Sequence, residues 1–378
     1  MKRNRLGGDG RFLFFCREKK KTKRSEGGTR MGYRKIAAGL LTAALLLAQS
    51  RTAGFANPGS PPAQPIVLAY YTADSDASLR QYSDRFNRLA TDTLNADAAG
   101  NLVGSVPERA LERADRAGME SYALVSNYGE NGWDADIARR VLNEPQAKIR
   151  LIRHMLRTVR THDYAGINID FEEVRPEDRA ALSRFVRDTA REMRKSGKKT
   201  MVSVPAKSED DPGNGWSGAF DYEALGREAD LIQVMTYDEH GMWSEPGSSA
   251  GLAWMESSLK FAVSEVEPSK LLAGIPAYGN DWNLSDPQDE SGAMLKWTEA
   301  RRIVRMLGNP GTRDARSLSM RLPYTAPGGD KHVLWYEDAY SIKLKARLAV
   351  RYRLAGLSVY ALGMEDETFW AALQAGLK

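Results

Sequence analysis

The feature that constrains the fold most is a regular alternation between short β-rich runs and helix-sized amphipathic segments. Eight such runs are IVLAYY (66–71), NRLATDTL (87–94), SYALVSN (121–127), GINIDFE (166–172), TMVSVP (200–205), LIQVMTY (231–237), LLAGIPAY (271–278) and GLSVYAL (356–362). Strands that alternate with helices indicate a parallel sheet with helical crossovers. Eight units of this kind close into an α/β fold, the (β/α)8 TIM barrel. We therefore expect one barrel domain over residues 66–378.

One interval breaks this alternation. About 80 residues separate the seventh run from the eighth, far more than one crossover helix needs. The interval contains a helical pattern near Thr298–Leu307 and two β-like pieces, SMRLPYT (319–325) and KHVLWYE (331–337). The sequence therefore predicts a small α+β insertion over residues 282–341, on the C-terminal rim of the barrel.

The charge of the chain is unevenly placed. The formal net charge is +5, but residues 1–35 carry 13 Lys or Arg and only three acidic residues, so the rest of the chain has a net charge of −5. Because the basic excess lies in a leader and not on a folded face, it does not indicate binding to nucleic acid.

The leader has the layout of a secretory signal. A basic start, the apolar run Ile36–Ala48 and a small-residue exit follow one another within residues 1–56. The apolar run is too short to span a bilayer comfortably. Gly54 and Ala56 suit the −3 and −1 positions of a cleavage site. We expect a secreted protein, extracellular or cell-wall associated, with no stable membrane insertion after cleavage.

The remaining features of the leader concern its start and its chemistry. Met31 is an alternative start to Met1, and the Pro-rich residues 57–65 (NPGSPPAQP) read as a tether. The single cysteine is Cys16, so a mature chain would have neither disulfides nor a cysteine-based metal site. The four histidines show no spacing typical of a metal site, and we expect neither a metal nor another cofactor.

The fourth β-rich run places three polar side chains on one face of a strand. Ile167, Ile169 and Phe171 alternate with Asn168, Asp170 and Glu172. In a barrel the apolar set would face the helices and the polar set the lumen. Three polar groups in one lumen row cost several kcal/mol unless each finds a partner. Glu172 would stand highest, at the C-terminal mouth where barrel active sites lie.

These residues resemble a known family. GINIDFE is similar to the strand-four motif of glycoside hydrolase family 18, commonly written DGxDxDxE, and most of all to the bacterial branch of spore-cortex and cell-wall N-acetylglucosaminidases, here without LysM repeats. VSNYG, VMTYDEHG, GIPAYGNDW, VLWYEDAYSIKLK and GLSVYALGMED fit the same branch in the same order. The resemblance covers nearly the whole chain after the leader.

The resemblance implies a substrate-assisted mechanism. In this family the acetamido oxygen of the substrate is the nucleophile. Glu172 would protonate the leaving oxygen and then act as base, while Asp170 would hold the acetamide N–H. Tyr237 would donate its hydroxyl to the acetyl oxygen. The like charge of Asp170 should raise the pKa of Glu172 and keep it a proton donor near neutrality.

The resemblance also implies sugar contacts at the rim. The residues expected there are Tyr70, Tyr278 and Tyr360 as flat surfaces, Met235 as a wall of the acetyl pocket, and Asn127 and Asp238 as hydrogen-bonding groups.

The chain departs from the family motif at three positions. Ala165 and Asn168 replace two aspartates, and Tyr360 stands where the family usually has a tryptophan. Asn168 can hydrogen-bond Asp170 but cannot exchange a proton with it, so we count Asn168 with the catalytic group. Tyr360 should retune binding of the sugar.

The leading hypothesis is an exported, retaining β-N-acetylglucosaminidase that cleaves β-1,4 bonds after N-acetylglucosamine in peptidoglycan, including that of the spore cortex. Two alternatives remain open: a chitinase or chitooligosaccharidase, and a non-catalytic glycan-binding protein on the same barrel. The expected partner is a glycan that contains N-acetylglucosamine, and we expect a monomer.

Overall fold

The structure of the protein, a computed structural model, describes residues 64–285 and 293–378. The predicted leader and signal (1–56) and nearly all of the predicted tether (57–65) lie outside these residues. Within the described part of the chain, no helix combines the length and the apolar content needed to cross a bilayer.

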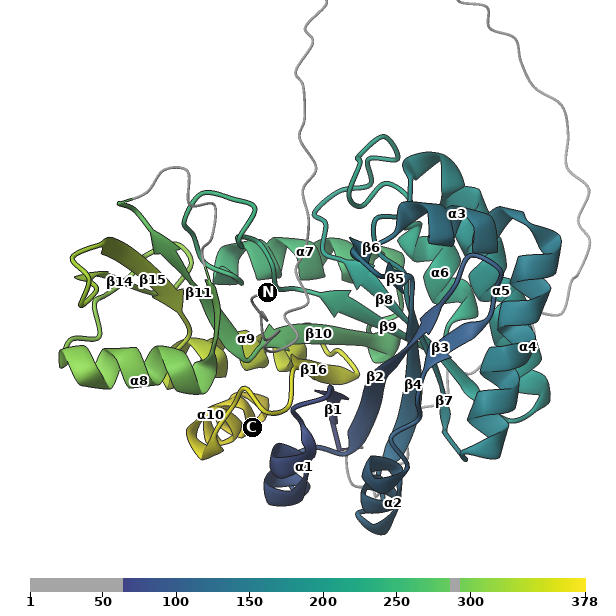
Figure 1. The fold of residues 1–378 in the computed structure, drawn as a ribbon, viewed down its shortest axis with the longest axis horizontal. Coiled ribbons are helices and arrows are strands. Elements are labelled where there is room, and N and C mark those ends of the chain that lie inside the picture. Colours follow the sequence, from purple (N-terminus) through teal and green to yellow (C-terminus); the bar gives the residue numbers. More distant parts are fainter. Residues whose placement is uncertain (1–63, 286–292) are drawn as a thin grey trace, which may run out of the picture. The chain divides into compact units, whose positions relative to one another are not determined.

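Eight parallel strands form a closed barrel, which confirms the predicted fold class (Figure 1). They are β1 (Ile66–Tyr71), β2 (Arg88–Ala96), β4 (Glu120–Ser126), β7 (Gly166–Asp170), β8 (Lys199–Pro205), β9 (Leu231–Met235), β10 (Leu271–Pro276) and β16 (Gly356–Tyr360). Their order is β1-β16-β10-β9-β8-β7-β4-β2, and β1 also pairs with β2, which closes the ring. Each of the eight β-rich runs in the sequence supplies one of these strands. A short strand, β3 (Leu102–Gly104), pairs antiparallel with the end of β2.

Helices connect the strands and cover the outside of the barrel (Figure 1). They are α1 (Asp76–Tyr82), α2 (Glu108–Arg116), α3 (Ala135–Asn143), α4 (Pro145–Thr161), α5 (Arg179–Lys195), α6 (Tyr222–Glu228), α7 (Leu252–Glu265), α9 (Ala339–Arg351) and α10 (Glu367–Leu377). Short 3-10 turns at Pro176–Asp178 and Pro268–Lys270, and a two-stranded hairpin of β5 (Tyr128–Gly129) and β6 (Gly132–Trp133), complete this part of the chain.

The two faces of β7 behave as the alternation predicts. Ile167, Ile169 and Phe171 belong to the apolar core between the barrel and its helices. Phe171 stacks on Phe185 of α5, with ring centroids 5.5 Å apart. Asn168 is fully buried and contacts side chains of β1 and β8 across the lumen. The strand therefore packs outward and presents its polar row inward.

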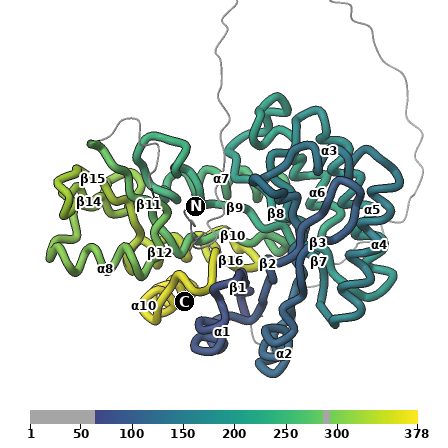
Figure 2. The backbone as a smooth tube through the Cα atoms, in the orientation of Figure 1, coloured from purple at the N-terminus to yellow at the C-terminus, as the bar shows by residue number. Residues whose placement is uncertain are grey.

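The interval between β10 and α9 forms a second, antiparallel sheet beside the barrel (Figures 1 and 2). Its strands are β11 (Tyr278–Asn283), β12 (Ala293–Lys296), β13 (Thr312–Arg313), β14 (Met320–Thr325) and β15 (Lys331–Tyr336), in the order β12-β11-β15-β14-β13, and its helix is α8 (Trp297–Leu307). A small apolar core that includes Ala300, Met320 and Leu334 joins the sheet to α8. We call residues 278–336 the insertion.

The bounds of the insertion differ from the predicted 282–341 at both ends. The run LLAGIPAY splits, because β10 ends at Pro276 and the chain enters the insertion sheet at Tyr278. At the other end, Asp338 caps α9 by accepting a hydrogen bond from the backbone N–H of Ser341 at 2.9 Å. Residues 339–341 therefore belong to a barrel helix.

The insertion is fixed to the segment that joins β9 to α7. The side-chain amide of Asn280 donates to the hydroxyl of Ser249 at 2.8 Å, and the indole N–H of Trp282 donates to the carbonyl of Ser244 at 3.1 Å. These bonds place one face of the insertion sheet against the C-terminal rim of the barrel, while α8 covers the other face.

Candidate active site

A cavity of about 70 Å³ lies at the C-terminal ends of the barrel strands. Its lining is Tyr70, Asp92, Tyr128, Trp133, Asp170, Glu172, Ser203, Met235, Tyr237, Asp238, Tyr278, Met294 and Tyr360. Of the ten site residues predicted from the sequence, eight line this cavity. The other two, Asn127 and Asn168, lie behind and beneath it.

Glu172 stands where β7 has just ended, at the mouth of the barrel. Burial raises its pKa well above the usual range, and the neighbouring carboxylate of Asp170 raises that pKa further. Asp238 acts in the same direction. The prediction of a raised pKa is confirmed in direction, with desolvation as the larger cause. A carboxyl group of this kind keeps its proton near neutrality and can act as a general acid.

Asn127 holds the backbone of Glu172 in place. Its side-chain oxygen accepts the backbone N–H of Glu172 at 2.8 Å, and its amide donates to the carbonyl of the same residue at 2.8 Å. The amide also donates to the carbonyl of Asp134 at 3.0 Å. Asn127 is fully buried and does not line the cavity. Instead of the predicted sugar contact, Asn127 makes contacts that position Glu172.

Asn168 forms part of the floor beneath the cavity. Its side-chain oxygen accepts the hydroxyl of Tyr70 at 3.1 Å, and its amide donates to the hydroxyl of Ser203 at 3.0 Å and to the carbonyl of Ile169 at 3.2 Å. Asn168 therefore links β7 to β1 and β8 through neutral groups.

Tyr237, two residues beyond the end of β9, supplies a protonated hydroxyl. Burial raises its pKa well above the usual range, and Tyr70 and Asp170 raise it further, so the group remains a donor. A Cβ atom at Gly274 would come within 2.6 Å of the Tyr237 ring. Glycine at this position of β10 therefore makes room for the ring.

Asp238 and Tyr278 form a hydrogen-bonded pair on the cavity wall. The hydroxyl of Tyr278 donates to Oδ1 of Asp238 at 2.6 Å. Burial raises the pKa of Asp238 to about 6, and the hydrogen bond from Tyr278 opposes this change. The pair links the segment after β9 to the first strand of the insertion.

Aromatic rings form one side of the cavity. Tyr360 lies 5.7 Å from Tyr70 and 6.0 Å from Tyr237, and Tyr237 lies 6.3 Å from Tyr278, measured between ring centroids. Met235 adds an apolar contact to the lining. Such surfaces suit the faces of a sugar ring while leaving hydroxyl groups at their edges.

Five lining residues were missed in the sequence: Asp92, Tyr128, Trp133, Ser203 and Met294. Asp92 is the single acidic residue of β2 and is flanked by two threonines, which is a weak signal for a functional carboxylate. Tyr128 belongs to the motif VSNYG, so the motif contained it. Nothing in the sequence marks Met294, which the insertion brings to the cavity.

His240 and Trp282, which lie in two of the family-like motifs, are outside the cavity. His240 binds the carbonyl of Glu245 at 3.2 Å, and Trp282 binds a backbone carbonyl as described above. Among the described residues, no group of three or more His, Cys, Asp or Glu side chains is placed to hold a metal ion. The cavity thus brings together a protonated carboxyl group, a second carboxylate and a tyrosine hydroxyl.

This constellation agrees with the relationships of the chain to known proteins. The model of glycosyl hydrolases family 18 matches residues 129–365. The chain is 40% identical over 324 residues to YvbX of Bacillus subtilis (strain 168), named as an uncharacterized glycosylase, which covers 85% of this chain and 94% of that protein. A cortical fragment-lytic enzyme of the same organism is 23% identical over 297 residues, or 78% of this chain and 68% of that enzyme.

Comparison with solved structures gives the same relationship. The crystal structure of a chitinase from Chromobacterium violaceum ATCC 12472 matches with a TM-score of 0.78 and 38% identity, over 83% of this chain and 99% of that one. The family match spans β7, β9, β10 and β16, which carry most of the cavity lining. The chain therefore belongs to glycosyl hydrolase family 18 and is a glycosidase.

Proposed function

We propose that this glycosidase cleaves β-1,4 bonds after N-acetylglucosamine with retention of configuration, using the acetamido group of the substrate as the nucleophile. The observation that carries the proposal is the pairing of Glu172 with Asp170 beside Tyr237 in the lining of one cavity. The raised pKa of Glu172 supports its role as the proton donor.

Each group has one role in this mechanism. Glu172 protonates the glycosidic oxygen as the bond to the anomeric carbon breaks. The acetamido oxygen attacks that carbon and forms an oxazolinium ion, while Asp170 accepts a hydrogen bond from the acetamide N–H. Tyr237 donates its hydroxyl to the acetyl oxygen and orients it. Glu172 then removes a proton from the incoming water.

We propose peptidoglycan as the substrate, reached by export of the enzyme to the cell wall or beyond. The pattern of residues 1–56 supports export, and the relationship to a cortical fragment-lytic enzyme supports a cell-wall glycan. Chitin oligomers are the second candidate, favoured by the 38% identity to a chitinase along almost all of that chain. Both polymers present the same acetamido group next to the scissile bond.

The deciding experiment compares purified peptidoglycan, chitin oligomers and deacetylated chitosan oligomers. We expect cleavage of N-acetylated glycan, product β-anomers in NMR spectra, and inhibition by a thiazoline mimic of the oxazolinium ion that binds more tightly than the substrate. Mass spectrometry of the products identifies which polymer is cleaved. Rapid cleavage of the deacetylated substrate, or α-anomers as first products, contradicts the mechanism.

The matched control for this experiment is Glu172→Gln. Glutamine keeps the size of the side chain but cannot donate the proton, so hydrolysis should fall by about 10²-fold or more while binding persists. Turnover near that of the wild type would remove Glu172 from the role of general acid.

A further inference from the structure

A second cavity lies outside the barrel lumen, between the insertion and α7. Its volume is about 580 Å³, which falls within the range of roughly 300–1,000 Å³ typical of small-molecule sites. Its walls come from the segment between β9 and α7, from the first turns of α7, and from the insertion residues Asp314–Ser317 and Trp335. None of its lining residues belongs to the catalytic cavity.

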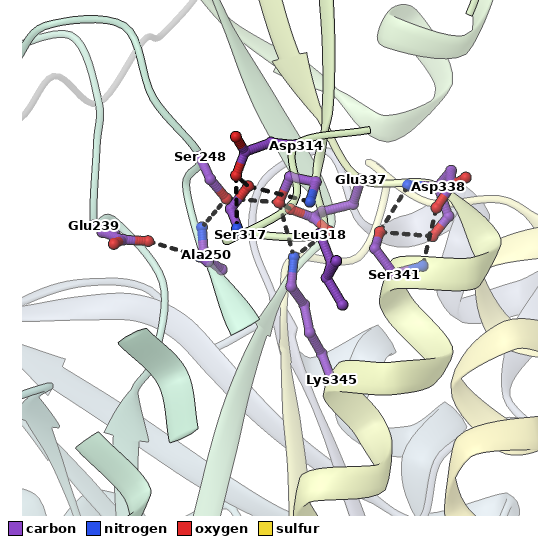
Figure 3. A network of polar contacts seen from close by, with 12 residues as sticks. Glu239, Ser248, Ala250, Asp314, Ser317, Leu318, Glu337, Asp338, Ser341 and Lys345 are labelled. Carbon is purple, nitrogen blue, oxygen red and sulfur yellow. Dashed lines mark hydrogen bonds and ion pairs between the residues drawn. The ribbon is translucent and has the colours of Figure 1, made fainter. Parts of the chain in front are cut away.

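The walls of the second cavity are fixed by hydrogen bonds. The backbone N–H of Leu252 donates to the carbonyl of Ser317 at 2.9 Å, which joins the insertion to the start of α7. Asp314 accepts the backbone N–H of Ser317 at 2.7 Å, and Glu239 accepts that of Gly251 at 2.7 Å. Figure 3 shows Glu239, Asp314 and Ser317 within this network of polar contacts. Fixed walls reduce the conformational cost of binding a ligand.

The chemistry of the lining combines flat apolar surfaces with available polar groups. Trp254 and Trp335 contribute indole rings. Arg316 is exposed and makes no ion pair with a described residue. The exposed hydroxyl of Ser257 adds a further donor and acceptor.

This combination favours one class of ligand. A simple anion would meet the carboxylates of Glu239 and Asp314, and a purely apolar ligand would shield Arg316 and Glu239 from water without adding a hydrogen bond to either. A neutral sugar satisfies both sets, because its C–H faces pack on indole rings and its hydroxyl and acetamido groups hydrogen-bond the polar groups.

We propose that the second cavity binds a further segment of the N-acetylated glycan and holds the polymer beside the catalytic cavity. Consecutive residues line the two cavities, since Asp238 belongs to the catalytic one and Glu239 to the second. A polymer that occupies both gains affinity because the second contact is intramolecular. The choice of glycan as ligand rests on the function proposed above.

Binding is tested in the Glu172→Gln background by calorimetry with a soluble β-1,4 N-acetylglucosamine oligomer that is too short to occupy both cavities at once. We expect two binding events. Ala253→Arg, which fills the cavity from an exposed position on α7, and Arg316→Ala should each abolish one event and leave the other unchanged. Arg305→Ala, an exposed arginine on α8, is the control and should change neither. A single event, or two events unaffected by Ala253→Arg, overturns the proposal.

Hydrolysis gives a second measurement in the wild-type background. Ala253→Arg and Arg316→Ala should lower cleavage of insoluble glycan by about 5–10-fold and leave turnover of a short soluble substrate unchanged. An equal loss on both substrates overturns the second site. If the wild type cleaves no N-acetylated glycan, the proposed function fails, whereas a binding event lost in Ala253→Arg still supports the second site.

Discussion

Glu172 and Asp170 are two residues apart in the sequence, and the structure shows why the carboxyl group of Glu172 favours its protonated form. The side chain of Glu172 is desolvated and faces other carboxylates, which raises its pKa. Its backbone is held by Asn127, which follows β4, because β4 pairs with β7 so that Ser126 lies opposite Asp170. The geometry of the general acid thus depends on a residue from a neighbouring strand.

The first prediction concerns Asn127. Asn127→Ala removes both hydrogen bonds to the backbone of Glu172 and leaves a buried N–H unpaired, which costs about 1–3 kcal/mol. We expect kcat to fall about 10–100-fold with little change in KM, because the general acid is displaced while the sugar contacts remain. The pH profile should shift as well, since the surroundings of Glu172 change.

The measurement is kcat, KM and the pH profile of each variant after its folded fraction has been checked by circular dichroism. Asn143→Ala is the control, because its side-chain amide also makes two hydrogen bonds, to Arg139 and Asp178, away from the cavity. A loss of thermal stability with unchanged kcat per folded enzyme would show that Asn127 is only structural.

At the scale of elements, a buried ion pair lies at the junction between the insertion and the barrel. Lys345 of α9 and Glu337, which follows β15, form an ion pair, and both side chains are almost completely buried. Ser319 donates to Glu337 at 2.6 Å and accepts from Lys345 at 3.2 Å, and Ser248 lies 2.6 Å from Ser319. Figure 3 shows Lys345 reaching from α9 towards Glu337 and Ser248.

The second prediction concerns this pair. Lys345→Met leaves Glu337 buried without its cation, and breaking a buried pair in this way costs about 3–5 kcal/mol. The double variant Lys345→Met, Glu337→Gln should recover a large part of that loss, because no isolated charge remains. The measurement is the free energy of unfolding in urea for the single and double variants.

The matched control for the ion pair is Lys260→Met, which removes an exposed cation on α7 that lies 3.6 Å from Glu256. Exposed pairs contribute about 0–1 kcal/mol, so the change should be small. Equal stability losses for the single and double variants at Lys345 would show that charge balance does not govern this junction.

At the scale of the whole molecule, the carboxyl groups of the catalytic cavity affect the pH dependence of folding stability, because their surroundings disfavour the charged form. Burial raises the pKa of Glu172, and it raises that of Asp238 to about 6. A folded-state pKa above the unfolded value stabilises the fold at low pH, and that stabilisation is lost as the pH rises through the folded pKa. The buried carboxyl groups of the site therefore lower the free energy of unfolding at neutral pH relative to low pH.

The third prediction follows from this sign. Asp238→Asn should raise the melting temperature at pH 8, where Asp238 is ionised, by about 2–5 °C. The gain should shrink as the pH falls through about 6 and vanish near pH 4, where the carboxyl group is protonated in the folded state. Scanning calorimetry across this range measures the effect, with the exposed Asp115→Asn on α2 as control. A gain that does not depend on pH contradicts the explanation.

The sequence by itself determined the barrel and the polar row of β7. Strand and helix periodicities are local properties of the chain, so the eight β-rich runs and the inward Asn168, Asp170 and Glu172 could be read from residue order alone. The length of the interval before the last strand also predicted an insertion, because a single crossover helix needs far fewer residues.

Only the tertiary structure decided how distant residues meet. Asn127 holds Glu172 because their strands are neighbours in the barrel, and a single asparagine after a strand carries no sign of its partner. The strand-like run LLAGIPAY divides between two sheets at Ala277, since pairing partners and not local propensity decide where a strand belongs. The second cavity exists because the insertion packs against α7, and contacts between segments so far apart in the chain depend on the three-dimensional arrangement and not on residue order.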